Sequence, residues 1–162
     1  MSSAAPAPTV QAPRAFNFVA ILVSALIYYA IESIWFSVFA KPWLNALGKT
    51  VPELLAELGS RPTWPLYVGA LICNLIIAFV MAWIFAQAGV RGALAGIRWA
   101  AMLWFGFVAT VMATNYSFEI RHVMLLVLDA GCPLAGMLAT GAILGGWRPK
   151  SRGSSLASSQ AR

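Results

Sequence analysis

Four long apolar runs divide this chain, and they constrain its fold more than any other feature. The runs cover residues 16–39, 66–86, 93–114 and 123–147. Each is long enough to cross the hydrocarbon core of a bilayer as a helix, which takes about 20 apolar residues. The sequence therefore predicts an all-α protein, an integral membrane four-helix bundle.

The composition supports a membrane protein and indicates what it contacts. Hydrophobic residues make up 60% of the chain and charged residues only 10%, whereas a soluble domain is about 25% charged. The net charge of +6 comes largely from residues that flank the apolar runs. Anionic lipid headgroups explain that placement better than nucleic acid does. We therefore expect the lipid bilayer as a partner and no nucleic acid.

The ends of the chain differ in composition from the four runs. Residues 1–15 are mostly Ser, Ala and Pro, and residues 148–162 are rich in Ser and Arg. Such segments cannot bury a core, so we predict a disordered N-terminal tail and a basic, disordered C-terminal tail around one transmembrane domain at 16–147. The first run is also longer than the apolar part of a secretory signal peptide, roughly 7–15 residues, so we expect it to be retained.

The longest polar connection, residues 41–64, contains a helix signal of its own. Thr50 and Glu53 have the spacing of a capping box, and Gly59 suits a helix end. Between them, four apolar residues follow the i, i+3, i+4, i+7 pattern. The pattern predicts a short amphipathic helix that lies flat on the membrane surface, in preference to a partner-binding helix.

Positive charges predict the orientation of the helices. Six lysines and arginines fall on the side of the N-terminus and four on the other side, which favours two cytoplasmic termini and, we expect, a bacterial inner membrane. The six are Arg14, Arg91, Arg148, Lys150, Arg152 and Arg162, and the four are Lys41, Lys49, Arg61 and Arg121. Tryptophans are expected at both membrane surfaces. The predicted outer ones are Trp35, Trp43 and Trp64, and the inner ones Trp83, Trp99 and Trp147.

Polar side chains inside the four runs define the candidate site. Glu32, Asn74, Thr110 and Asp129 come one from each run, and helix counting puts them at similar depths in the outer half. Pro133 adds to this because it leaves the carbonyl of Asp129 without its usual donor. Intramembrane acids often mark a site for a proton, cation or small polar ligand. The alternative is that these groups only bond one another and fix helix packing.

Glycines at four-residue spacing predict close helix contacts. Gly92 and Gly96 lie at the beginning of the third run, and Gly141 and Gly145 in the fourth. Gly106 begins a further stripe in the third run, which Thr110 and Thr114 continue. Such small-xxx-small stripes let two backbones approach each other. We expect them to serve packing within one bundle first, and the seam of a homo-oligomer second.

Signatures of catalysis are missing from the sequence. It has no G-x-S-x-G, H-E-x-x-H or phosphate-binding glycine loop, and its one histidine and two cysteines lack metal-ligand spacing. We therefore expect no catalytic residues, no metal and no cofactor. The expected role is to bind or pass a small solute or a proton; the alternative is a structural or accessory subunit with a membrane partner protein.

Three short motifs resemble a known family. They are W-F-S…F-A-K-P-W at residues 35–43, A-T-N-Y at 113–116, and L-D-A-G at 128–131 with G-G-W-R at 145–148. In this order and spacing the chain resembles the bacterial membrane proteins catalogued as domain of unknown function 1761. Phe36 stands where that pattern has Tyr, and Glu32 where a small residue is usual. The resemblance implies a four-helix membrane fold and no particular mechanism.

Overall fold

The computed structural model describes residues 16–147, and within this range all regular elements are helical. Four helices are long and apolar enough to cross a membrane, which confirms the predicted fold class. The third span is continuous over Ala93–Phe118 and contains a π-helical stretch, η1. The two predicted tails lie outside the described residues. The elements are α1 (Phe18–Val38), α2 (Ala40–Leu47), α3 (Val51–Leu58), α4 (Trp64–Ala88), α5 (Ala93–Leu103), η1 (Trp104–Ala109), α6 (Thr110–Phe118) and α7 (Val123–Gly146).

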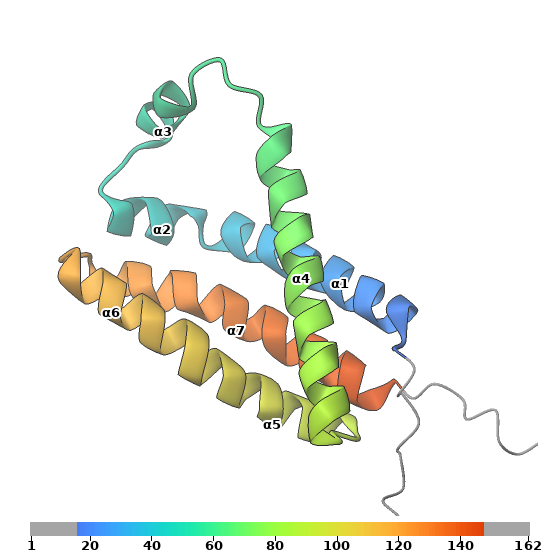
Figure 1. Ribbon diagram of the computed structural model, residues 1–162. Helices are drawn as coiled ribbons and strands as arrows, with labels where there is room; N and C mark the ends of the chain where they lie inside the picture. Colours follow the sequence, from blue (N-terminus) through green and yellow to red (C-terminus); the bar gives the residue numbers. More distant parts are fainter. Residues whose placement is uncertain (1–15, 148–162) are drawn as a thin grey trace, which may run out of the picture.

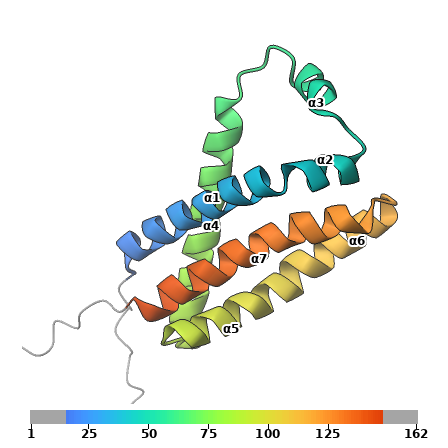
Figure 2. The same cartoon turned by 180° about the vertical axis from the view of Figure 1, so that it is seen from behind.

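Three of the spans lie side by side in one layer, with α7 in the middle. α1 packs on one side of α7 and the third span on the other, while α4 crosses the layer steeply and packs mainly on α1 (Figures 1 and 2). The beginning of α1, the end of α7 and the turn between α4 and α5 share one end of the layer, here called the termini end. The opposite end carries α2 and the end of α6 and is called the α2 end.

Glycines allow the backbones of α5 and α7 to touch. A Cβ on Gly96 would lie 1.9 Å from the carbonyl oxygen of Gly141, and a Cβ on Gly145 would lie 2.5 Å from that of Gly92. The amide of Gly92 also donates to the carbonyl of Gly145 at 2.7 Å. Gly106 does not take part in this contact, because a Cβ there would meet no atom within 4 Å. Its face of the third span points away from α7.

Two boundaries differ from the sequence expectations. The third span extends beyond the predicted residue 114, since α6 continues to Phe118. The polar connection holds a helix that we did not predict, α2, which ends at Gly48 in the left-handed conformation with φ 71°. Lys41 and Pro42 suggest a loop, but proline fits the first turn of a helix, where its missing N–H costs nothing. α2 continues α1 past a bend and contacts the beginning of α7.

The predicted short helix is present as α3. The amide of Thr50 donates to the carboxylate of Glu53 at 2.7 Å, and Lys49 pairs with Glu57 at 2.6 Å. The hydrogen bonds from the Thr50 amide and hydroxyl lower the pKa of Glu53. Because the pKa of Glu53 is lowered in the folded protein, the cap stabilises α3 at any pH above the ordinary pKa of glutamate. This stabilisation is lost as the pH falls through the lowered pKa of Glu53. α3 stands off the layer, between α2 and α4 (Figures 1 and 2).

Cysteine labelling tests the arrangement of the spans. We expect Arg91→Cys, in the turn between α4 and α5, and Glu57→Cys, on α3, to react from opposite sides of the membrane. The 25 residues of α4 separate them by about 37 Å at ~1.5 Å per residue. The background carries Cys73→Ala and Cys132→Ser, and a membrane-impermeant maleimide on sealed vesicles gives the readout. Reaction of both cysteines from the same side contradicts the four-span topology.

Candidate functional site

Three consecutive residues of α7 collect hydrogen bonds from aromatic side chains of other helices. The indole N–H of Trp35 donates to the carbonyl of Leu128 at 3.1 Å, and that of Trp104 donates to the carbonyl of Ala130 at 2.9 Å. Both carbonyls lie about one turn before Pro133, which interrupts the backbone hydrogen-bond ladder of α7. The two indoles therefore supply donors to the stretch of α7 where proline disturbs the ladder, and they join α1 and η1 to it.

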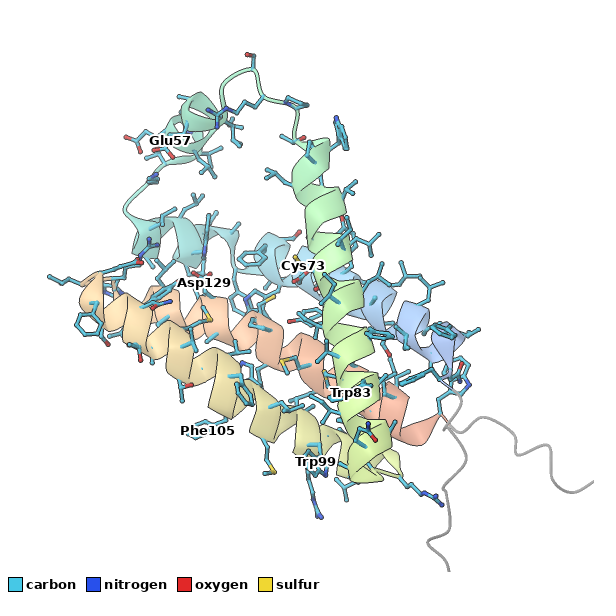
Figure 3. The ribbon with its side chains drawn as sticks, viewed as in Figure 1. Glu57, Cys73, Trp83, Trp99, Phe105 and Asp129 are labelled. Carbon is cyan, nitrogen blue, oxygen red and sulfur yellow. The ribbon has the colours of Figure 1, made fainter. Side chains whose placement is uncertain are left out.

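Asp129, the residue between these two carbonyls, binds two further side chains. Its Oδ1 accepts from the indole N–H of Trp43 at 2.9 Å, and its Oδ2 accepts from the hydroxyl of Tyr116 at 2.6 Å. Asp129 lies where α2 passes over α7 (Figure 3). Since both of its oxygens are occupied, it ties α2, α6 and α7 together.

Glu32 joins a different pair of helices. Its Oε2 accepts from the amide Nδ2 of Asn74 at 2.7 Å, which links α1 to α4. Asn74 is 2% exposed and Glu32 is half-buried. Within residues 16–147 the second oxygen of Glu32 has no hydrogen-bond partner. One carboxylate oxygen thus remains available inside the spans.

Tyr28 and Cys132 complete the surroundings of Glu32. Tyr28 lies one turn before it on α1, is 2% exposed, and packs its ring so closely on Gly136 that a Cβ there would lie 2.2 Å from the ring. The buried Cys132 of α7 lies one turn before Gly136, the residue on which Tyr28 packs. These residues are called the Glu32 cluster: Tyr28, Glu32, Asn74 and Cys132, on α1, α4 and α7.

The four predicted site residues therefore do not form a single site. Glu32 and Asn74 meet, but among the described residues Glu32 and Asp129 share no hydrogen bond. α1 and α7 are antiparallel, with Trp35 near Gly131 and Tyr28 near Gly136, so Asp129 lies about one turn, ~5 Å, nearer the α2 end than Glu32 does. The structure does not bring Thr110 to either acid: it is exposed and donates to the carbonyl of Gly106 in its own helix at 2.7 Å.

Sequence reasoning missed the aromatic partners. Trp35 and Trp43 were expected at the membrane surface, but their N–H groups point to α7. Tyr116 was noted only as part of the motif at 113–116, and Trp104 was given no role. A usable signal was present, because an indole N–H or a phenol hydroxyl within the spans needs an acceptor, and Asp129 beside Pro133 offers several.

The donor set of these sites is unlike a metal centre. No group of three His, Cys, Asp or Glu side chains that could hold a metal ion occurs in the range 16–147. The partners of the two acids are an amide, an indole and a phenol. Such donors hold carboxylates in place, and among the described residues they leave the second oxygen of Glu32 unpaired.

The sequence of the chain matches one known protein family. No curated protein and no solved structure matches the chain. The model of the family described as "Protein of unknown function (DUF1761)" matches residues 19–145, which include nearly all of the four spans and both acids. The chain is therefore a multi-pass membrane protein that belongs to the DUF1761 family.

Proposed function

We propose that this protein binds and passes a proton or a small polar solute at Glu32, without enzymatic chemistry. The observation that carries the proposal is the half-paired carboxylate: Asn74 holds one oxygen of Glu32 and the other is free among the described residues. An acid inside a membrane span is expensive to keep, and it commonly marks the path of an ion or substrate. Asn74 fixes the carboxylate, and the free oxygen is the exchanging position.

In this proposal Asp129 has a structural task. Both of its oxygens are occupied by donors from α2 and α6, so it holds the α2 end of the bundle together.

The positive charges at the chain ends and at the α4–α5 turn support an orientation with both termini in the cytoplasm of a bacterial inner membrane. The substrate site then lies in the outer half of the bilayer.

A second candidate function has its own supporting observation. Every donor around Asp129 links two helices, and the Glu32–Asn74 bond does so as well. An accessory subunit, whose polar groups only specify packing against its own helices or a partner protein, accounts for these links. The two candidates differ in what they expect of the free oxygen of Glu32.

Flux through liposomes separates the two candidates. We expect purified protein to conduct protons down a pH gradient in liposomes carrying an internal pH dye and valinomycin, and Glu32→Gln to abolish that flux. Gln retains an oxygen that accepts from Asn74, so thermal stability should stay unchanged while the exchanging proton is lost. The matched control is Glu57→Gln, an exposed acid on α3, which should conduct like wild type.

The opposite result supports the accessory subunit. Wild-type liposomes that conduct no better than protein-free ones, with no pH-dependent binding of a solute, contradict a site at Glu32. In that case Glu32→Gln should be silent, whereas Glu32→Leu should lower stability by about 1–3 kcal/mol, because the buried Asn74 amide loses its acceptor.

A further inference from the structure

Two buried hydroxyl groups stand out among the Ser and Thr residues of the spans. Ser24 on α1 and Thr140 on α7 are both 0% exposed, and neither oxygen has a hydrogen-bond partner among the described residues. The exposed hydroxyls of the spans all donate to the carbonyl four residues earlier; they are Ser33, Ser37, Thr110, Thr114 and Ser117. A buried hydroxyl without a partner is costly, and residues 16–147 supply none to either group.

The two hydroxyls lie at one level between the same two helices. Tyr28 of α1 packs on Gly136 of α7, and the helices are antiparallel. Ser24 is four residues before Tyr28, and Thr140 is four residues after Gly136, so both lie one turn toward the termini end. The turn of Tyr28 and the turn of Ser24 and Thr140 thus carry polar groups at successive levels, spaced by about 6 Å.

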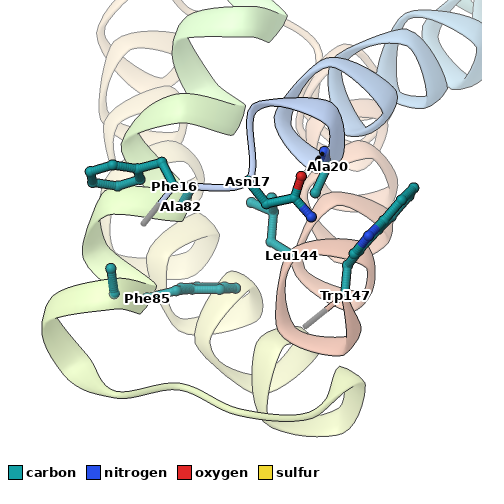
Figure 4. A pocket seen from close by; sticks show the side chains of 8 residues that line it. Phe16, Asn17, Ala20, Ala82, Phe85, Leu144 and Trp147 are labelled. Atoms are coloured by element: carbon teal, nitrogen blue, oxygen red, sulfur yellow. Dashed lines mark hydrogen bonds between the residues drawn. The ribbon is translucent and has the colours of Figure 1, made fainter. Parts of the chain in front are cut away.

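A pocket lies one helical turn closer to the termini end than the hydroxyls of Ser24 and Thr140. It has a volume of about 100 Å³ and lies between the beginning of α1, the end of α4 and the end of α7. Ala20, one turn before Ser24, and Leu144, one turn after Thr140, both line it. Figure 4 shows the polar side chain of Asn17 between these walls, with Phe85 on the α4 side. The volume is sufficient for several water molecules.

We infer that Ser24 and Thr140 bind water between α1 and α7, and that this water connects the pocket at the termini end with the Glu32 cluster. A water molecule can accept from and donate to both hydroxyls, which satisfies groups that the protein leaves unpaired. The next polar group toward Glu32 is the phenol of Tyr28. Hydroxyls and water pass a proton by taking one on oxygen and releasing their own, so each group is restored.

This inference rests on the proposed function and specifies from which end of the bundle Glu32 exchanges its proton. The groups that face Glu32 are Tyr28 on its own helix, Asn74 on α4 and Cys132 on α7, with Asp129 one turn farther. At the α2 end Asp129 and its two aromatic donors are paired. Within residues 16–147 the buried hydroxyls without partners, Ser24 and Thr140, lie on the opposite side. Glu32 therefore exchanges its proton with the termini end through the Ser24–Thr140 water.

Radiolytic labelling detects such water without any assay of function. Hydroxyl radicals formed from bound water in an X-ray beam label adjacent side chains, and mass spectrometry locates the label. We expect label on the buried Tyr28 in wild type and its loss in Ser24→Ala/Thr140→Val. The matched control, Ser33→Ala/Thr114→Val, removes two exposed hydroxyls from the spans and should keep the label. Each single substitution provides the same test if the double variant does not fold.

Proton flux then separates this inference from the function on which it rests. Flux that depends on Glu32 and falls to the level of Glu32→Gln in the double variant supports both. If wild type conducts through Glu32 but Tyr28 is unlabelled and the double variant conducts normally, the water route is overturned and the function stands. If Tyr28 is labelled through Ser24 and Thr140 but no flux depends on Glu32, the water site stands and the transport function fails.

Discussion

Gly96→Ala should strongly destabilise the protein, whereas Gly106→Ala in the same span should not. The added methyl group at residue 96 would lie 1.9 Å from the backbone oxygen of Gly141, which cannot rotate away. α5 and α7 must then separate, and the Gly92–Gly145 hydrogen bond is lost with the contact. Overpacking of this kind costs about 1–3 kcal/mol, and we expect at least the upper value because the obstacle is backbone.

Gly106→Ala is the matched control, since its Cβ would meet nothing within 4 Å. An alanine in a helix is favoured over glycine by up to about 1 kcal/mol, so this variant should melt at the same temperature as wild type or higher. Thermal unfolding in detergent, followed by circular dichroism with size-exclusion chromatography, gives the comparison. Equal melting of Gly96→Ala and wild type contradicts the backbone contact between α5 and α7.

Asp129→Ala should produce the second large effect, a loss of about 2–3 kcal/mol. The substitution leaves the indole N–H of Trp43 and the hydroxyl of Tyr116 without their acceptor, and each such bond within a membrane protein is worth roughly 1–2 kcal/mol. Asp129→Asn should lose less, because its amide oxygen still accepts from one of the two donors. Glu119→Ala is the control: this acid is exposed and pairs only with the exposed Arg121.

A double-mutant cycle checks that the effect comes from these bonds. Trp43→Phe removes one donor, so it should be destabilising in wild type and nearly silent in Asp129→Ala. The readout is the free energy of unfolding from thermal or denaturant melts in detergent. Additive effects of Trp43→Phe and Asp129→Ala contradict the interaction, and an unchanged melt of Asp129→Ala contradicts the structural task assigned to this acid.

The individual elements show what local sequence could and could not predict. The four spans and the α3 helix follow from the length of apolar runs and from the Thr50–Glu53 spacing, both local signals. α2 was missed because Lys41 and Pro42 look like a loop, and its stability comes partly from contact with α7. The glycine spacing indicated close packing, but four-residue spacing does not say which stripe meets a partner. Gly96 meets α7 and Gly106 meets nothing.

For the candidate site, too, the sequence predicted some features and not others. Depth along a helix is set by residue count, so the sequence could place Glu32, Asn74, Asp129 and Thr110 as polar residues at similar depths within apolar runs. Which of them touch depends on how each helix is rotated about its axis. That rotation points Thr110 away from the bundle and separates Asp129 from Glu32. It also turns Trp35 and Trp43 toward α7.

The sequence by itself determined that the chain crosses a membrane four times, where each span lies and which polar residues it carries, because hydrophobic length and turn chemistry are local properties. Only the tertiary structure decided which groups are paired. It placed α7 in the middle of the layer and, within residues 16–147, gave Asp129 two donors and Glu32 one and left Ser24 and Thr140 buried without partners. The physical reason is that a hydrogen bond between helices requires a particular rotation and crossing of both, and packing of all the spans sets these together.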